Sequence, residues 1–323
     1  MSSGHNRIWG YTSKSSVVQF LAIALYVTCE SAVAQIHDDV GNSTPIHEPE
    51  HYEDRRRPLK LLESDQEFLR RFPGTNVGSY KASGSITCPT GIGSAVLLCD
   101  SRTIVTNYHV IADDYVETDG VQVLKKMIPE GVKECYYSPY NEDKGYYLEA
   151  LNVANLSRQF GTRYPGTVGQ HGSDWAILRL RDPVPSNMAK PVNIVYLSAK
   201  NDMRSGETKK MRLLQVAGGG DVSFPEPYYQ LCKPSWPSID RNRNYFLPTD
   251  CVIGSGSSGS GVFIHNGKRH ALLAVNASFG LGYLSGGSEY QGGAAFSEVF
   301  VEALETMTDD TSCMTTLDAF LKE

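Results

Sequence analysis

The sequence predicts an all-β barrel or sandwich that is followed by helical segments at the carboxyl end. The candidate strands are short, rich in apolar and β-branched residues, and separated by Gly, Pro, Asn or Ser. This pattern favours an antiparallel β architecture over the regular alternation of strands and helices in α/β folds. With 323 residues, of which 41% are apolar and 20% charged, the chain has a globular composition and enough length for a large core.

The predicted elements follow in order along the chain. A capping-box pattern, Ser64-Asp65-Gln66-Glu67, opens a short helix that continues through Phe72. Apolar and β-branched runs then predict strands at residues 94–99, 103–106, 175–180, 210–217, 261–265, 271–277 and 294–296. Residues 298–307 and 317–322 are the two stretches that we expect to be helical at the carboxyl end.

Residues 1–34 have the three parts of a secretory signal peptide. Arg7 and Lys14 supply positive charge, residues 17–27 form an apolar run, and Ala32-Val33-Ala34 offers small residues for cleavage. The apolar run is too short to cross a bilayer of about 30 Å as a helix, and no later run is long enough. We therefore expect a secreted or periplasmic protein without a membrane span.

Residues 35–76 are predicted to be a pro-segment or a disordered leader. The stretch 35–74 contains nine acids, the run Arg55-Arg56-Arg57 and three histidines, with no apolar periodicity before Ser64. The spacing of these histidines matches no metal-ligand pattern, so a solvated polar segment is the interpretation that we favour.

Charge and cysteine content exclude several function classes. The net charge is −6, and it becomes −7 when the signal takes two positive charges and one negative charge with it. Non-specific nucleic-acid binding needs a basic face, so we expect no nucleic-acid partner. After the loss of Cys29, six cysteines remain, which in an exported protein predict up to three disulfides with 15 possible pairings. No CxxC pair is present, and we expect no metal and no other cofactor.

Three fragments carry the residue types of acyl-transfer chemistry. The first, Gly254-Ser255-Gly256-Ser257-Ser258-Gly259-Ser260-Gly261, precedes an apolar strand. Glycines on both sides of a serine allow a tight turn that exposes the hydroxyl and points backbone N–H groups at one spot. A flexible linker is the plain alternative, although a linker rarely lies between a cysteine and a buried strand.

The other two fragments supply a base and a carboxylate. His109 follows the β-branched run 103–106, where a rigid strand end could hold a general base. Asp174 stands at the start of the apolar run 175–180, where it could orient an imidazole. Each residue alone is more often structural, but the three fragments together point to a Ser-His-Asp site.

These fragments resemble the His, Asp and Ser motifs of chymotrypsin-like serine proteases. The resemblance covers about residues 77–300 and lies in Thr106-Asn107-Tyr108-His109-Val110, Asp174-Trp175-Ala176-Ile177-Leu178 and Gly256-Ser257-Ser258-Gly259-Ser260, in the family's order. Within the family, the serine fragment is similar to that of bacterial secreted enzymes of the glutamyl-endopeptidase type.

The resemblance implies two packed six-stranded antiparallel β-barrels, at residues 77–187 and 188–300, and a helical segment at 301–323. It implies a secreted serine endopeptidase that hydrolyses peptide bonds through an acyl-enzyme intermediate. Ser258 would be the nucleophile, His109 the base and Asp174 the group that orients it, with the N–H groups of Gly256 and Ser258 as the oxyanion hole. Its partners would be protein or peptide substrates, and we expect a monomer.

The resemblance also indicates where the chain departs from the family pattern. Ser257 stands where trypsin-type zymogens carry an aspartate, and an Ile-Val-Gly-Gly start is absent, so we predict that activation does not use that ion pair. Val252 aligns with the base of the specificity pocket, Asn276 lies near the histidine that glutamyl endopeptidases use, and Gly293 would line the far wall. We therefore predict a neutral pocket for apolar or medium-sized polar side chains.

The position of two cysteines relative to Ser258 suggests one disulfide. Cys232 and Cys251 flank the approach to Ser258 and are the pair that we expect to be bonded. Cys88–Cys99 and Cys135–Cys313 would complete the set, and other pairings stay open.

Three alternatives were weighed against the endopeptidase. In an α/β-hydrolase, the motif around Ser258 would end in Gly rather than Ser260, and a histidine would follow far downstream. A chaperone-protease with a peptide-binding domain would need more chain after Ser258. The alternative from another class is a catalytically inactive homologue that acts as a secreted binding protein, and that alternative predicts broken motifs, whereas all three are intact.

Overall fold

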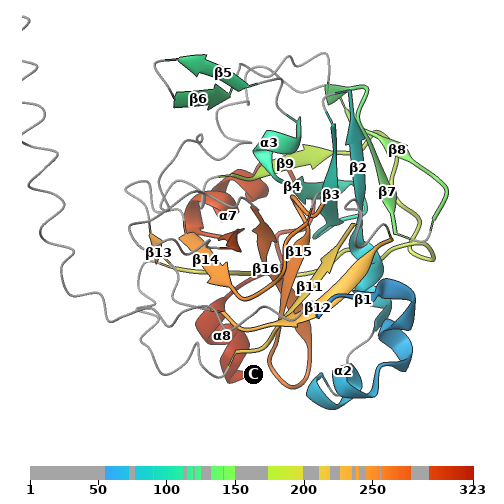
Figure 1. The fold of residues 1–323 in the computed structure, drawn as a ribbon, viewed down its shortest axis with the longest axis vertical. Helices are drawn as coiled ribbons and strands as arrows, with labels where there is room; N and C mark the ends of the chain where they lie inside the picture. The colour runs from blue at the N-terminus through green and yellow to red at the C-terminus, as the bar shows by residue number, and fades with distance from the viewer. Residues whose placement is uncertain are drawn as a thin grey trace, which may run out of the picture. The chain divides into compact units, whose positions relative to one another are not determined.

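The computed structural model describes residues 55–72, 77–89, 91–111, 115–118, 121–124, 132–140, 142–149, 174–198, 211–218, 226–234, 238–239, 245–254, 256–277 and 291–323. In these ranges the chain is mostly β, with two large and mainly antiparallel sheets and two helices at the carboxyl end (Figure 1). The predicted fold class is thereby confirmed. The predicted signal peptide and residues 35–54 lie outside the described ranges.

The first sheet has the six strands expected for one barrel. Their order is β8 (Tyr146–Tyr147), β7 (Tyr136–Pro139), β2 (Ser83–Cys88), β3 (Gly91–Leu97), β4 (Thr103–Thr106) and β9 (Ala176–Arg179). Every neighbouring pair is antiparallel, and β4 is bounded by the residues that the β-branched run predicts.

The second sheet has ten strands among the described residues, four more than expected. Its main path runs β1 (Arg57–Pro58), β12 (Tyr228–Cys232), β11 (Leu213–Ala217), β15 (Gly261–His265), β16 (His270–Asn276), β17 (Gln291–Ala295), β14 (Tyr245–Thr249) and β13 (Ser238–Ile239). Two further strands, β10 (Ile194–Tyr196) and β18 (Met314–Thr316), extend from β16 in parallel pairs. The first and last of the ten, β1 and β18, lie outside the predicted domain 188–300.

The remaining elements are short. They comprise the 3-10 turns η2 (Leu59–Ser64) and η3 (Val77–Ala82), the helices α2 (Gln66–Arg71), α3 (Tyr108–Ile111), α7 (Glu298–Glu305) and α8 (Leu317–Lys322), and the hairpin of β5 (Tyr115–Thr118) and β6 (Val121–Leu124). Within the described ranges, none of the helices has the length and apolar character needed to span a membrane.

The central strands of the second sheet are buried on both faces. Along β15, Phe263 belongs to the main core, which it shares with the first sheet, whereas Val262 and Ile264 belong to a second core. Alternate residues of a strand point to opposite faces, so this division follows from the strand period of two. Phe320 of α8 belongs to the second core, and this helix therefore covers the face that is turned away from the first sheet.

Residues 55–72, here called the leader segment, are part of the folded body. β1 pairs with β12 (Figure 1). The rings of Phe68 and Phe72 are buried in the main core. Asp65 caps α2 by accepting hydrogen bonds from two backbone N–H groups, and it also accepts a bond of 2.5 Å from Arg57. Each buried phenylalanine contributes about 1.5–3 kcal/mol of transfer free energy. The prediction of disorder is therefore wrong for the leader segment, while its processing stays a prediction.

We predict that stability falls with acidification because of a buried histidine next to the leader segment. His270 stacks on Tyr80, with ring centroids 4.6 Å apart, and burial together with a smaller effect of His265 lowers the pKa of His270 to about 4. An unfolded histidine titrates near 6.5, so the contribution is complete above about pH 6.5 and is lost as the pH falls towards 4. We expect a loss of roughly 2 kcal/mol between pH 7.5 and pH 5 from this group.

Urea unfolding at the two pH values measures this effect. His270→Phe keeps an aromatic ring in the stack and removes the titrating group, so its stability should depend less on pH than that of the parent. An equal loss of stability in both proteins would contradict the assignment.

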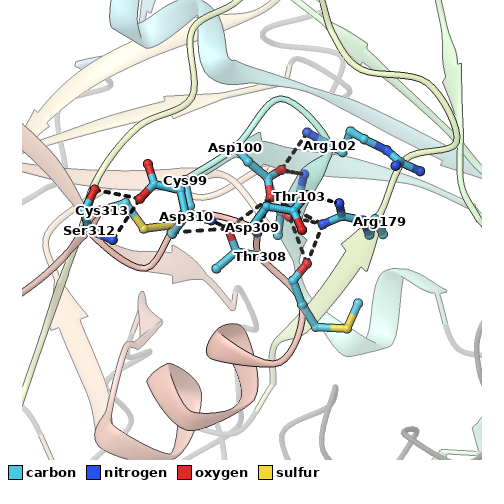
Figure 2. The surroundings of a disulfide bond; sticks show 11 residues. Cys99, Asp100, Arg102, Thr103, Arg179, Thr308, Asp309, Asp310, Ser312 and Cys313 are labelled. Atoms are coloured by element: carbon cyan, nitrogen blue, oxygen red, sulfur yellow. Dashed lines mark hydrogen bonds and ion pairs between the residues drawn. A yellow bond between two sulfur atoms is a disulfide. The ribbon is translucent and has the colours of Figure 1, made fainter.

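The carboxyl-terminal segment is fastened to the first sheet around the Cys99–Cys313 disulfide (Figure 2). Asp100 accepts hydrogen bonds from the backbone of Arg102, Thr103 and Asp309, and Arg179 donates to the Met307 carbonyl over 2.6 Å. Burial alone would raise the pKa of Asp100, but these bonds outweigh it and hold that pKa below its usual value. The carboxylate therefore joins the loop after β3 to the chain after α7.

The disulfides are partly those expected. Cys232–Cys251 is present. The other two are Cys88–Cys135 and Cys99–Cys313, so the predicted completion of the set with Cys88–Cys99 and Cys135–Cys313 is wrong. The physical reason lies in the sheet: Cys88 ends β2 next to β7, and β7 begins directly after Cys135, whereas Cys99 leaves β3 at its other end.

Candidate active site

His109 and Asp174 form a close pair at one end of the first sheet. β4 ends at Thr106, and the short helix α3 carries His109 three residues beyond it. The ring nitrogen Nδ1 of His109 lies 2.6 Å from Oδ2 of Asp174, and the backbone N–H of His109 donates to Oδ1 over 3.1 Å. The side chains are 10% and 2% exposed respectively, so the pair is largely shielded from water.

The position of Asp174 is fixed from both sides. Asn107, which is buried between β4 and α3, donates from its side-chain amide to the Asp174 carbonyl over 2.6 Å. Trp175 is buried edge-on against Phe300 of α7, with ring centroids 4.9 Å apart. These contacts hold the carboxylate at the start of β9, which pairs with β4, so both partners stand at the same edge of the sheet.

Ser258 lies in a tight turn between two glycines with positive φ. Gly256 has a φ of 81° and Gly259 a φ of 83°, values that side chains with a Cβ rarely adopt. Inside the turn, the N–H of Ser257 donates to the Gly254 carbonyl over 3.1 Å, and the N–H of Ser260 donates to the Ser257 carbonyl over 2.9 Å. The glycine spacing therefore has the role that the sequence indicates, since it allows the tight turn.

This turn packs against the strands that lead to His109. A Cβ on Gly259 would lie 2.1 Å from the Ser94 carbonyl oxygen and 2.4 Å from Oγ1 of Thr106, so only glycine fits there. A Cβ on Gly93 would lie 2.7 Å from Val110 and 3.0 Å from the Ser258 carbonyl oxygen. Ser258 thus lies where the second sheet meets β3, β4 and α3.

Of the predicted pocket residues, Val252 is tied into a chain of buried amides. Its N–H donates to Gln230 over 3.0 Å, Gln230 donates to Gln215 over 2.5 Å, and Gln215 donates to the Ser260 hydroxyl over 2.8 Å. This chain connects the segment before the serine turn with the strands beneath it. Neither glutamine stands in a motif that marks it as part of the site. The one signal is that Gln215 lies inside the apolar run Leu213-Leu214-Gln215-Val216, where a buried polar group needs partners.

Asn276 and Gly293 face each other across β16 and β17. The Asn276 carbonyl accepts a hydrogen bond from the N–H of Gly259 over 2.8 Å, so this residue touches the serine turn directly. Its side chain is 1% exposed, and its amide nitrogen has no hydrogen-bond partner within the described residues. The structure therefore places a buried, uncharged residue against the turn through its backbone carbonyl. It shows no cluster of metal-ligating residues in the described ranges.

Comparisons with known proteins found similar solved structures but no similar family model or curated protein. No protein-family model matches the chain. No curated protein matches it either. Matching solved structures include a Glu endopeptidase in complex with MPD, with 15% identity, a TM-score of 0.44, and coverage of 79% of this chain and 96% of that chain.

Two further matching structures are those of an HtrA-type protease and of an inactivated protease paralogue. The HtrA-type protease AlgW with a tripeptide has 16% identity and a TM-score of 0.43, and the match covers 72% of this chain but only 62% of AlgW. The scabies mite inactivated protease paralogue S-D1 has 12% identity and a TM-score of 0.43, with coverage of 71% and 91%. These identities and TM-scores are too low to transfer activity or site residues to this chain.

Proposed function

We propose that the protein is a secreted serine endopeptidase of the chymotrypsin-like type, with Ser258 as nucleophile, His109 as general base and Asp174 as the orienting carboxylate. The observation that carries this proposal is the 2.6 Å contact between His109 and Asp174 at the junction where the Ser258 turn packs. This contact gives an imidazole a fixed carboxylate partner next to a serine in a tight turn.

The contact with Asp174 determines which form of His109 would act. A carboxylate accepts hydrogen bonds, so Nδ1 of His109 carries the proton and Nε2 keeps its lone pair. This lone pair on Nε2 is what a general base uses to take up a proton. Asp174 would also stabilise the imidazolium once that proton has been transferred.

The reaction would proceed through an acyl-enzyme. As Ser258 Oγ attacks the scissile carbonyl carbon, its proton moves to Nε2 of His109, and the carbonyl oxygen becomes an oxyanion that the N–H groups of Gly256 and Ser258 would bind. The C–N bond then breaks, and the His109 proton goes to the leaving amine. A water molecule, deprotonated by His109, hydrolyses the ester and restores the hydroxyl of Ser258.

We propose a neutral specificity pocket formed by Val252, Asn276 and Gly293. None of these residues carries a charge, so nothing among them would pair with an Arg, Lys or Glu side chain of a substrate. The side-chain amide of Asn276 could donate to an uncharged polar side chain. Peptide-library profiling should show cleavage after apolar or medium-sized polar residues, and cleavage only after Glu or Arg would refute this assignment.

Export is supported by two independent features. Residues 1–34 have the pattern of a secretory signal, and the described cysteines form three disulfides, which persist in oxidising compartments. We propose that the mature protein is secreted or periplasmic and monomeric, and that it acts on proteins or peptides.

Fluorophosphonate labelling tests the proposed activity. We expect one adduct in the intact mass of the parent protein, and no adduct in Ser258→Ala or His109→Ala, because the reagent needs an activated serine. Ser312→Ala is a matched control, because Ser312 is exposed and, among the described residues, its hydrogen bonds go only to Asp310. This variant should still form the adduct.

The alternative, an inactive homologue that binds other molecules, would give the opposite result. A folded parent protein without an adduct would mean that the serine is not activated, and the binding protein would then be the better interpretation.

A further inference from the structure

We propose that Ser94 is a positioning residue whose hydroxyl and backbone N–H direct the peptide groups of the oxyanion hole. This inference rests on the proposed function, because it concerns the turn that carries Ser258. Ser94 lies in β3 of the first sheet and is 1% exposed. It contacts the turn at two carbonyl oxygens, that of Gly256 and that of Ser258, the residue that would bear the nucleophile.

Four separate segments of the chain meet at the Ser94 hydroxyl. Ser94 Oγ lies 2.8 Å from the Gly256 carbonyl oxygen and 2.8 Å from the hydroxyl of Tyr140, and it receives the N–H of Gly218 over 3.0 Å. Gly256 belongs to the serine turn, Tyr140 follows β7, and Gly218 follows β11. The cluster therefore joins both sheets to the turn.

The hydrogen-bonding capacity of a hydroxyl fixes the direction of these bonds. A serine hydroxyl has one hydrogen to donate and two lone pairs to accept with. The Gly256 carbonyl can only accept, so it takes the hydrogen of Ser94, and the N–H of Gly218 can only donate. Tyr140 must then donate as well. Burial raises the pKa of Tyr140, which keeps its phenol protonated and able to do so. All three positions of the Ser94 hydroxyl are thus filled.

The backbone of Ser94 holds the turn at a second point. Its N–H donates to the Ser258 carbonyl over 2.7 Å, while the intervening Ser257 carbonyl accepts from the N–H of Ser260. Three consecutive carbonyl groups, those of Gly256, Ser257 and Ser258, are therefore held in place, two of them by Ser94.

These anchors control the N–H groups of the proposed oxyanion hole. In a trans peptide the N–H points away from the C=O of the same plane, so the Ser257 carbonyl, which the N–H of Ser260 holds, aims the N–H of Ser258. The Gly256 carbonyl, which Ser94 holds, fixes the peptide plane between Gly256 and Ser257. This plane lies between the two planes that contain the N–H groups of Gly256 and Ser258, and the backbone torsions of Gly256, with φ at 81°, and of Ser257 join it to them. Without the Ser94 hydroxyl, the peptide between Gly256 and Ser257 would keep only the bond from its N–H to the Gly254 carbonyl, and it could rotate more easily, since glycine permits many backbone conformations.

Kinetics of Ser94→Ala test this role. The variant loses the hydroxyl but keeps the backbone N–H that holds Ser258. We expect kcat to fall about 10- to 100-fold, less than the roughly 10²–10³-fold cost of deleting a hole donor outright, because the donors are misdirected rather than removed. KM for a peptide substrate should change less than about threefold, since the hole binds the transition state more strongly than the ground state.

Active-site titration separates positioning from folding. Rates are expressed per fluorophosphonate-titrated site, so a variant that merely folds less well would show fewer sites with an unchanged rate for each. Tyr140→Phe is the matched control: it removes a donor to Ser94 but leaves the Ser94–Gly256 bond, and its kcat per site should stay within about threefold of the parent. If Ser94→Ala does not fold, Ser94→Cys keeps a weak donor of similar size and should show an intermediate loss.

Each result decides between defined outcomes. A lower kcat per site in Ser94→Ala, with KM and the Tyr140→Phe variant near the parent, supports the inference. An unchanged kcat per site, or an equal loss in Tyr140→Phe, overturns it and leaves the proposed protease intact. A parent protein that fluorophosphonate does not label overturns the proposed function, and the role of Ser94 with it.

Discussion

Replacing Ser258 with alanine is expected to lower kcat by about 10⁶-fold, and replacing His109 in the same molecule is expected to add almost nothing to that loss. The reason is that the two residues act as a unit: the imidazole has no hydroxyl to deprotonate once Ser258 is absent, and the hydroxyl has no base once His109 is absent. The magnitude is that of subtilisin, in which the corresponding single losses nearly equal the loss of the whole triad.

A double-mutant cycle measures this coupling. Hydrolysis of one activated ester is followed for the parent, Ser258→Ala, His109→Ala and the double variant, and Ser312→Ala serves as the control with unchanged kcat. Losses that multiply in the double variant would show that the two residues act independently, which would contradict a shared proton transfer. The three variants that lack Ser258, His109 or both should hydrolyse the ester at similar residual rates, all above the rate of uncatalysed hydrolysis, because substrate binding and the oxyanion hole remain.

The sequence predicts the strands well wherever local pattern and burial agree. The β-branched run 103–106 becomes β4 without any shift, because this strand lies inside the first sheet and all four residues are buried. The predicted strand 210–217 begins three residues late, at Leu213. The local pattern does not indicate that the leader segment is folded, because its apolar residues follow no regular period within a charged stretch, although Leu62, Phe68 and Phe72 are buried.

Features that depend on non-local geometry could not be predicted. Six cysteines allow many pairings, and the choice between Cys99–Cys313 and its alternatives depends on where α7 and the following loop meet β3. The extra strands β1 and β18 are similar cases, since two or three residues contain no periodicity to detect.

The residues of the candidate site likewise divide into those that local sequence indicates and those that depend on non-local geometry. His109, Asp174 and Ser258 stand in motifs that their own neighbours define, so the sequence indicates them directly. Ser94 stands in no such motif, because its partners are the residues that follow β7 and β11 and a residue of the serine turn, all of which are distant in sequence. The one local signal is Gly93, since a glycine inside a strand indicates close approach of another backbone, here that of Ser258.

Asp174→Asn is expected to lower kcat by about 10⁴-fold while leaving the fold intact, as the equivalent change does in trypsin. The structure gives the reason. The backbone N–H of His109 donates to Oδ1 of Asp174, so the amide of an asparagine would turn its oxygen towards that N–H. Its NH₂ group would then face Nδ1 of His109, at the position where Oδ2 lies 2.6 Å away.

A donor at that position reverses the tautomer. Nδ1 must then accept, so the ring proton moves to Nε2, which can no longer take the proton of Ser258. Asp182→Asn is the matched control, because Asp182 is an exposed carboxylate that follows β9, the strand that Asp174 precedes. The kcat of this variant should equal that of the parent. Steady-state hydrolysis of one peptide substrate by the three proteins measures the difference. Retention of kcat within about tenfold in Asp174→Asn would mean that the carboxylate does not select the tautomer of His109, and another partner of the imidazole would then have to hold it.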